Sequence, residues 1–412
     1  MLTARGRGLN IATVVDKENS SYTLLPELLA RGMEHTEGRF TGYKNLSLYY
    51  QYWLPAREPK AILLVVHGAC EHSGRYTNLV NHFVPKGYAI FGLDHRGHGK
   101  SEGLRGYVER FQNYLNDLKT FFDIVRRKHS NTKIFLVGHS MGGLIATAYA
   151  VHHQHELAGL LLSGAALKIG SSWSPALIAV GRVLSLLLPK MRVPGPEPSA
   201  ISRDQAVVDA CLNDPLCCGD KLRARTGAEV IKTIQKLPRQ MPDIKLPILI
   251  MHGTVDQISD PEGSRMLYKR VSSKDKSLKL YNGFYHEIFN EPGHNQVFAD
   301  IEAWLATHIL LSQTCLSLLH MVMFNIKGTD LKPAPHFFLV AGSGFEGYER
   351  QGGLYLFLAI AIVINPSIPM PIAGPIVVSD KKVHTANAMQ RIPTISLSFL
   401  NFTSNFLPQF AV

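Results

Sequence analysis

Short apolar runs recur through the middle of the chain, and they constrain its fold more than any other feature. Each run is four to six residues long, and most of them lack the polar alternation of a strand with one face in water. Strands that are apolar on both faces are typical of a parallel sheet covered by helices on each side. We therefore predict an α/β fold with a mostly parallel central sheet flanked by helices. The predicted strands are Ala61–Val66, Tyr88–Leu93, Ile134–Val137, Gly159–Leu162, Ile248–Met251 and Leu278–Tyr281.

The chain divides around these runs into a main domain, an insertion and two terminal segments. We expect a disordered or weakly ordered leader over residues 1–37, an α/β domain over 38–311 and an extension of undefined structure over 312–412. A helical insertion over 168–240 interrupts the domain after the fourth strand. Its first part, Ala176–Leu188, has the length of a helix and a single charged residue. Two interpretations of this helix stay open, a buried packing helix or an exposed lid that contacts lipid.

Composition narrows the class of protein. Apolar residues make up 46% of the chain and charged residues 18%, which is the balance of a globular protein. The formal charge of +11 favours anionic surfaces such as phospholipid headgroups. Because the basic residues are scattered and no nucleic-acid-binding motif occurs, we expect no nucleic acid partner.

Five cysteines without a C-x-x-C pair argue against a disulfide framework and structural zinc. Since the first thirty residues lack the apolar stretch of a signal peptide, a cytoplasmic location is expected.

The strongest local signal is Gly138-His139-Ser140-Met141-Gly142, a G-x-S-x-G pattern. It lies directly after a predicted strand and before the helical run Leu144–His152. In that setting the serine lies on a sharp turn that exposes its Oγ above the sheet, and the new helix directs free N–H groups to the same place. The pattern predicts that Ser140 is a nucleophile and that the N–H of Met141 supplies part of an oxyanion hole.

Two later loops supply the groups that a serine nucleophile requires. Asp256 and His286 each come shortly after a predicted strand, so the chain order is Ser, Asp, His. A histidine removes the serine proton, and the acid fixes the histidine tautomer. Spacing alone also permits Asp260 as the acid or His294 as the base. Both lie nearer the start of the next helix, where such residues usually cap or turn the chain, so we favour Asp256 and His286.

The loop after the first predicted strand is expected to complete the oxyanion hole. Gly68 lets the chain turn so that the N–H of Ala69 points at a developing oxyanion. His67 and His72 could be read as metal ligands. With no carboxylate or cysteine nearby at ligand spacing, we expect His67 to be a turn-packing residue and expect no metal site or cofactor.

From about Phe40 to His308, roughly two thirds of the chain resembles the monoacylglycerol lipases, in the S33-like and lysophospholipase branch of the α/β-hydrolase superfamily. The resemblance implies an α/β-hydrolase fold, hydrolysis of one fatty acyl ester of glycerol, a cap formed by the insertion, and transient docking of that cap on membranes. The stretches that carry it are His67–Tyr76, Asp94–Gly103, Gly138–Gly143 and Asn213–Leu216.

The resemblance also assigns roles to individual residues. Two positions depart from its pattern: Cys70 replaces a usual glycine, and Cys211 stands where the animal enzyme has a tyrosine near the glycerol end. For Glu71 and Arg75 a loop-bracing ion pair is an equal alternative to binding glycerol hydroxyls. By resemblance, Ser140, Asp256 and His286 are the catalytic triad, Ala69 and Met141 the oxyanion donors, and Glu71 and Arg75 the polar end of the substrate site.

The leading hypothesis is a serine hydrolase that cleaves monoacylglycerol through an acyl-enzyme, peripherally associated with membranes. A lysophospholipase or a general carboxylesterase is the alternative within the same chemistry, because a triad does not report the head group. A non-catalytic lipid-binding protein on the same fold is the alternative outside it. Dehalogenases and epoxide hydrolases are excluded because they place an aspartate where Ser140 stands.

Overall fold

The structure is a computed structural model that describes residues 33–169, 174–194, 197–217 and 221–309, together with 339–341 and 360–362. The chain forms two units that divide at Thr329. In the second unit, β11 (Leu339–Ala341) and β12 (Ile360–Ile362) pair antiparallel. Most of the expected leader and C-terminal extension lies outside the described residues.

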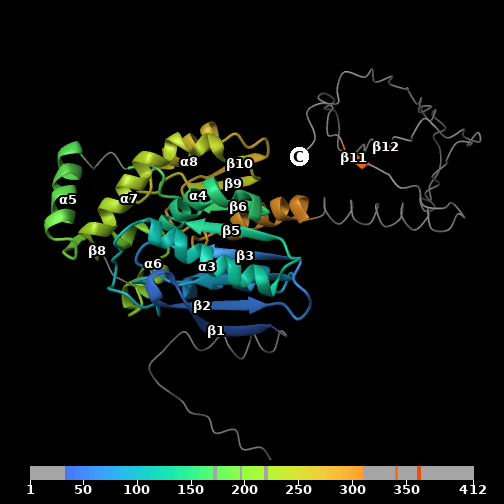
Figure 1. The fold of residues 1–412 in the computed structure, drawn as a ribbon, viewed down its shortest axis with the longest axis horizontal. Helices are drawn as coiled ribbons and strands as arrows, with labels where there is room; N and C mark the ends of the chain where they lie inside the picture. Colours follow the sequence, from blue (N-terminus) through green and yellow to red (C-terminus); the bar gives the residue numbers. More distant parts are fainter. Residues whose placement is uncertain are drawn as a thin grey trace, which may run out of the picture. The chain divides into compact units, whose positions relative to one another are not determined.

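An eight-stranded sheet forms the centre of the first unit, in the order β1-β2-β4-β3-β5-β6-β9-β10 (Figure 1). From β4 to β10 every neighbouring pair is parallel, so the predicted mostly parallel sheet is confirmed. These strands match the six predicted runs, with extensions of one to two residues at four of them: β3 (Ala61–Val66), β4 (Tyr88–Leu93), β5 (Ile134–His139), β6 (Gly159–Ser163), β9 (Ile248–Gly253) and β10 (Lys276–Tyr281).

Two antiparallel strands that the sequence pattern did not predict extend one edge of the sheet. β1 (Glu34–Thr41) pairs with β2 (Ser47–Leu54), and β2 pairs with β4. β1 is an edge strand with only Phe40 buried, so its sequence is polar and lacks an apolar run. Because β1 begins at Glu34, the ordered domain starts before the boundary at residue 37 that we expected.

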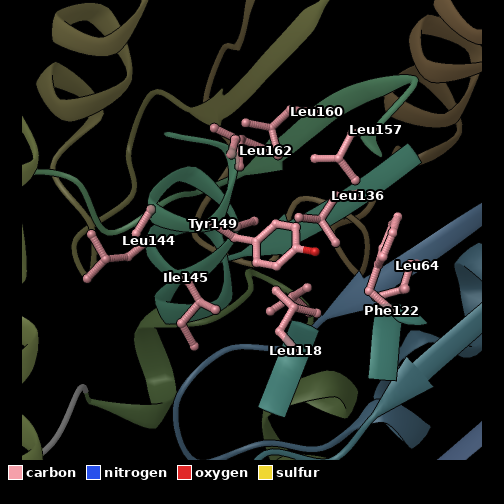
Figure 2. Packing of buried hydrophobic residues seen from close by; sticks show 14 of the residues in the cluster. Leu64, Leu118, Phe122, Leu136, Leu144, Ile145, Tyr149, Leu157, Leu160 and Leu162 are labelled. Atoms are coloured by element: carbon pink, nitrogen blue, oxygen red, sulfur yellow. The ribbon is translucent and has the colours of Figure 1, made fainter. Parts of the chain in front are cut away.

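Helices cover both faces of the sheet, which explains the continuous apolar strands. Successive side chains of β3 enter two different cores, with Ile62 and Leu64 in one and Leu63 and Val65 in the other. Figure 2 shows the first core, where strand residues such as Leu64 meet helix residues such as Phe122. The first core is covered by α3 (Gln112–Lys128), α4 (Met141–His153), α7 (Ala224–Lys236) and α8 (Pro261–Arg270), and the second by α2 (Thr77–Phe83) and a helix over 295–309.

The insertion between β6 and β9 is helical, as expected for a cap. Its first helix, α5 (Pro175–Leu187), packs on α7 and lies at the periphery of the domain (Figure 1). Five apolar side chains of this region, Val180, Val183, Leu186, Leu187 and Leu188, are 53–73% exposed. The exposure favours the lid interpretation over a buried helix. The elements of the insertion are α5 (Pro175–Leu187), β7 (Arg192–Pro194), η5 (Pro198–Ala200), α6 (Gln205–Asn213), β8 (Lys221–Arg223), α7, η6 (Leu237–Arg239) and η7 (Met241–Asp243).

Among the residues that the structure describes, no helix is both long and apolar enough to cross a bilayer.

Candidate active site

The loops that carry the candidate residues all leave the same edge of the sheet. Val66 at the end of β3 is in register with Gly138 of β5, and Tyr281 at the end of β10 is in register with Gly253 of β9. Since neighbouring parallel strands end together, the loops after β3, β5, β9 and β10 converge at one place. Ligands of open parallel sheets bind at this carboxyl edge.

Ser140 lies in a strained turn between β5 and α4. Its φ of 53° and ψ of −121° place it in a region that non-glycine residues rarely adopt. The main chain is fixed there, because its N–H donates to the carbonyl of Ser163 and its carbonyl accepts from the N–H of Ala166, both at 3.0 Å. A Cβ on Gly142 would lie 1.9 Å from the carbonyl oxygen of Val66, so only glycine lets β3 pass this close.

Asp256 and His286 are hydrogen-bonded to each other in a buried site. His286 Nδ1 lies 2.7 Å from Asp256 Oδ2. The other carboxylate oxygen accepts the N–H groups of Ile258 at 2.8 Å and Ser259 at 2.9 Å. Burial works to lower the pKa of His286, but the Asp256 carboxylate raises it above its ordinary value. The pKa of Asp256 is lowered against the effect of burial, chiefly by the charge of His286 and the hydrogen bond from His252.

His252 is a functional neighbour that sequence reasoning missed. Its Nε2 lies 2.9 Å from Asp256 Oδ2 and 3.1 Å from the carbonyl of Ser259. A carbonyl only accepts, so Nε2 carries the proton, and Nδ1 then accepts from the Ser264 hydroxyl at 2.7 Å. His252 and His286 therefore both contact the same carboxylate oxygen, Asp256 Oδ2. The predicted strand ends at Met251, one residue before His252, whereas β9 extends to Gly253 and includes it.

The two alternative residues lie elsewhere. Asp260 caps α8 by accepting from the N–H of Glu262 at 2.9 Å, and it pairs with Lys168 at 2.8 Å. His294 Nδ1 bonds to the carbonyl of Glu291 at 2.9 Å. The structure thus brings Asp256 and His286 together and gives Asp260 and His294 capping and turn roles.

A pocket at this edge is lined by Ser140 and His286 together with residues of the β3 loop and the cap. Ala69 lies in its wall, whereas Met141 is buried behind Ser140 as the first residue of α4. Cys70 has a φ of 63°, in the left-handed region that favours glycine. The apolar side chains in the pocket wall are Pro198, Ile201 and Leu212 from the cap and Ile258 from the loop after β9.

Charged side chains form the polar side of the pocket. Arg75 donates to both carboxylate oxygens of Glu287, at 2.6 and 3.0 Å, while Glu71 lies farther away at 3.8 Å. Glu71 instead accepts from the N–H of Gly68 and, at 3.0 Å, from the hydroxyl of Tyr76. Burial raises the pKa of Glu71 even though Arg75 lies near it.

The pairing of Arg75 differs from the one considered from the sequence. The ion pair that was weighed joined Arg75 to Glu71, but the closest partner is Glu287. Glu287 was missed, although its position directly after His286 was a signal. Glu71 braces the turn at Gly68 that presents Ala69.

The two histidines of the β3 loop have separate roles. His67 Nδ1 bonds to the carbonyl of Gly68 at 2.7 Å, and its Nε2 accepts from the N–H of His95 at 2.9 Å. His72 Nε2 lies 2.8 Å from Asp214 Oδ2 of the cap. Its Nδ1 accepts from a backbone N–H at 3.1 Å, so the Nε2 proton lies between ring and carboxylate. The sequence offers His72 no carboxylate or cysteine at ligand spacing, whereas the fold brings Asp214 and Cys217 of the cap beside it, with one ligand atom of each residue within 4.8 Å of the others. The bond to Asp214 links the cap to the core.

Comparison with known proteins agrees with this geometry. The family described as serine aminopeptidase, S33, matches residues 57–293. The monoacylglycerol lipase of Mycolicibacterium smegmatis is 35% identical over 66% of this chain and 98% of its own length. The monoglyceride lipase of Mus musculus is 32% identical over 71% of this chain and 93% of its own.

Solved structures give the same result. A soluble variant of monoglyceride lipase from Saccharomyces cerevisiae, in complex with a substrate analog, superposes with a TM-score of 0.60 at 27% identity, covering 66% of this chain and 94% of its own. The monoacylglycerol lipase of Paleococcus ferrophilus superposes with a TM-score of 0.57 at 29% identity, covering 67% of this chain and 99% of its own. The chain therefore belongs to the serine aminopeptidase S33 family of α/β-hydrolases and is a relative of the monoacylglycerol lipases.

Proposed function

We propose that this protein is a serine hydrolase that cleaves the ester bond of monoacylglycerol to fatty acid and glycerol. The observation that carries the proposal is a strained Ser140 in the same pocket as His286, whose ring is hydrogen-bonded to the buried Asp256. The identity of 32–35% to monoacylglycerol lipases, over more than nine tenths of their length, supports the substrate class.

The reaction uses the chain's own groups and proceeds in two halves. In the first, Ser140 Oγ attacks the ester carbonyl while His286 Nε2 takes the serine proton, and the imidazolium is stabilised by Asp256. The N–H groups of Ala69 and Met141 stabilise the oxyanion, and glycerol leaves with the proton from His286. In the second half, water repeats the sequence on the acyl-enzyme and releases the fatty acid.

The two sides of the pocket suit the two ends of this substrate. Arg75, Glu71 and Glu287 offer charged donors and acceptors to glycerol hydroxyls. The acyl chain would lie against apolar cap residues such as Ile201 and Leu212, each buried methylene contributing about 0.8 kcal/mol.

The exposed apolar side chains of α5 support peripheral binding to a membrane as part of this function. Leu186 and Leu187 are each 73% exposed, and the net charge of +11 favours an anionic surface. We expect the double variant Leu186→Ser with Leu187→Ser to bind anionic phospholipid vesicles less tightly in a flotation assay. The control is Tyr43→Ser, which removes another exposed apolar side chain. Added salt should weaken wild-type binding. Equal binding by both variants would contradict the role of α5.

A three-substrate assay on the full chain tests the function. Purified protein is given monoacylglycerol, lysophosphatidylcholine and a short-chain nitrophenyl ester, beside Ser140→Ala. We expect the highest kcat/KM on monoacylglycerol and loss of all three activities in the variant. Preference for the phospholipid would make the protein a lysophospholipase, and preference for the short ester a general carboxylesterase. If the folded protein hydrolyses none of the three substrates, the result would favour a non-catalytic lipid-binding protein.

A further inference from the structure

Two cysteines of the cap lie next to each other at the wall of the candidate active site. Cys211 belongs to the last turn of α6, and Cys217 lies in the turn that follows. Their Sγ atoms are 4.0 Å apart, which is within contact distance for two sulfur atoms. Both residues are free thiols of intermediate exposure. The mechanism above uses neither thiol.

The position of Cys211 makes its sulfur both accessible and electrostatically activated. It lines the same pocket as Ser140 and Arg75, so a small molecule that reaches the serine also reaches this thiol. The hydrogen bond with Cys217 and the positive charge of Arg75 hold the pKa of the Cys211 thiol below its ordinary value, although burial opposes them. Thiolate character and access are the two conditions for oxidation of a cysteine.

We propose that Cys211 and Cys217 are a peroxide-sensitive pair that forms a disulfide and thereby lowers the kcat/KM of ester hydrolysis. The ligand of this site is a hydroperoxide. In the first step, the Cys211 thiolate attacks one peroxide oxygen, so an S–O bond forms and the O–O bond breaks. Sulfur is oxidised to a sulfenic acid, and the peroxide is reduced to an alcohol, or to water if it is hydrogen peroxide.

The second step needs no further oxidant. The Cys217 sulfur attacks the sulfenic sulfur, the S–S bond forms and the S–O bond breaks, and hydroxide leaves with the Cys217 proton as water. The two sulfur atoms must approach from 4.0 Å to about 2.0 Å.

The disulfide would act on the active site through two routes. It removes the thiolate beside Arg75 and draws the Cys211 sulfur along the pocket wall. It also ties the end of α6 to the turn after Asp214, whose carboxylate is bonded to His72 of the core loop. That loop carries Ala69, the proposed oxyanion donor. Since a displacement of about 1 Å near the chemistry can cost about a hundredfold in rate, we expect oxidation to lower kcat/KM at least about tenfold.

The experiment treats the full-length reduced protein with hydrogen peroxide at increasing concentration. Peptide mapping by mass spectrometry follows the Cys211–Cys217 disulfide, and ester hydrolysis is measured on the same samples before and after dithiothreitol. We expect the disulfide to appear in step with the loss of activity, and dithiothreitol to reverse both. Cys217→Ser should give no disulfide at Cys211. The matched control Cys218→Ser, one residue along, should behave as the wild type.

Three results would overturn the proposal. The first is a disulfide at Cys211 that still forms in Cys217→Ser. The second is a disulfide at Cys211 that is lost in Cys218→Ser but not in Cys217→Ser. The third is formation of the Cys211–Cys217 disulfide without any change in ester hydrolysis. The activity readout rests on the proposed function, but the peptide map does not. A protein that forms the disulfide yet hydrolyses no ester when reduced would therefore refute the hydrolase and not the oxidation site.

Discussion

Replacing Gly142 by alanine tests the close approach on which the nucleophile turn depends. The new methyl group would lie 1.9 Å from the Val66 carbonyl oxygen and 2.4 Å from that of His67. To restore ordinary contact at 3.4 Å, the end of β3 and the start of α4 must separate by about 1.5 Å. The movement takes Ala69 away from Ser140. An oxyanion donor acts only near 3 Å, so we expect kcat/KM to fall about a hundredfold or more. Overpacking should also cost about 1–3 kcal/mol of stability.

The measurements are hydrolysis of a nitrophenyl ester and urea unfolding, with Gly227→Ala as the matched control. Gly227 lies in α7, where an added Cβ meets nothing within 4 Å among the described residues. That variant should keep wild-type kcat/KM and gain up to about 1 kcal/mol from helix propensity. If Gly142→Ala retains kcat/KM within twofold of the wild type, the contact between β3 and the turn does not position the oxyanion hole, and the reasoning fails.

Two further substitutions probe the charged groups. Asp256→Asn should lower kcat by about four orders of magnitude, as loss of the acid does in other triads. Asp256 raises the pKa of His286, and activity is lost as the pH falls through that pKa. The acid limb of the pH–rate profile of the variant should therefore lie at lower pH than that of the wild type. An acid limb at the wild-type pH would contradict the pairing of Asp256 with His286. Glu287→Gln should cost about 2–4 kcal/mol in urea unfolding, because Arg75 then keeps only the more distant Glu71. A loss below about 0.5 kcal/mol would mean that the Arg75–Glu287 pair contributes little.

Most of the central sheet could be predicted from the sequence because burial on both faces leaves an apolar run with no alternation, as in β3, β4, β5, β6 and β9. β1 could not be predicted by that criterion, since an edge strand with one buried residue carries a polar sequence. Periodicity likewise left the environment of α5 open, because an apolar helix has the same pattern in a core and on a lid. Its exposed Leu186 and Leu187 became visible only in the fold.

The candidate site also contains residues that the sequence could predict and contacts that it could not. Ser140, Asp256 and His286 were found because each follows a strand, and the carboxyl edge of a parallel sheet gathers such loops. The partner of Arg75 was not found, because Glu287 is 212 residues away and only the register of the sheet brings them together. The contact between Cys211 and Cys217 depends on how α6 ends, which spacing alone does not determine.

The most direct test of the account is to locate the reactive residue by labelling with a fluorophosphonate, which phosphonylates an activated serine. Native protein is treated with the probe, digested and mapped by mass spectrometry. The account predicts one phosphonyl group, on Ser140, and a greatly reduced rate of labelling in His286→Ala. Labelling of a different residue, or an unlabelled Ser140 in folded and active protein, would contradict it.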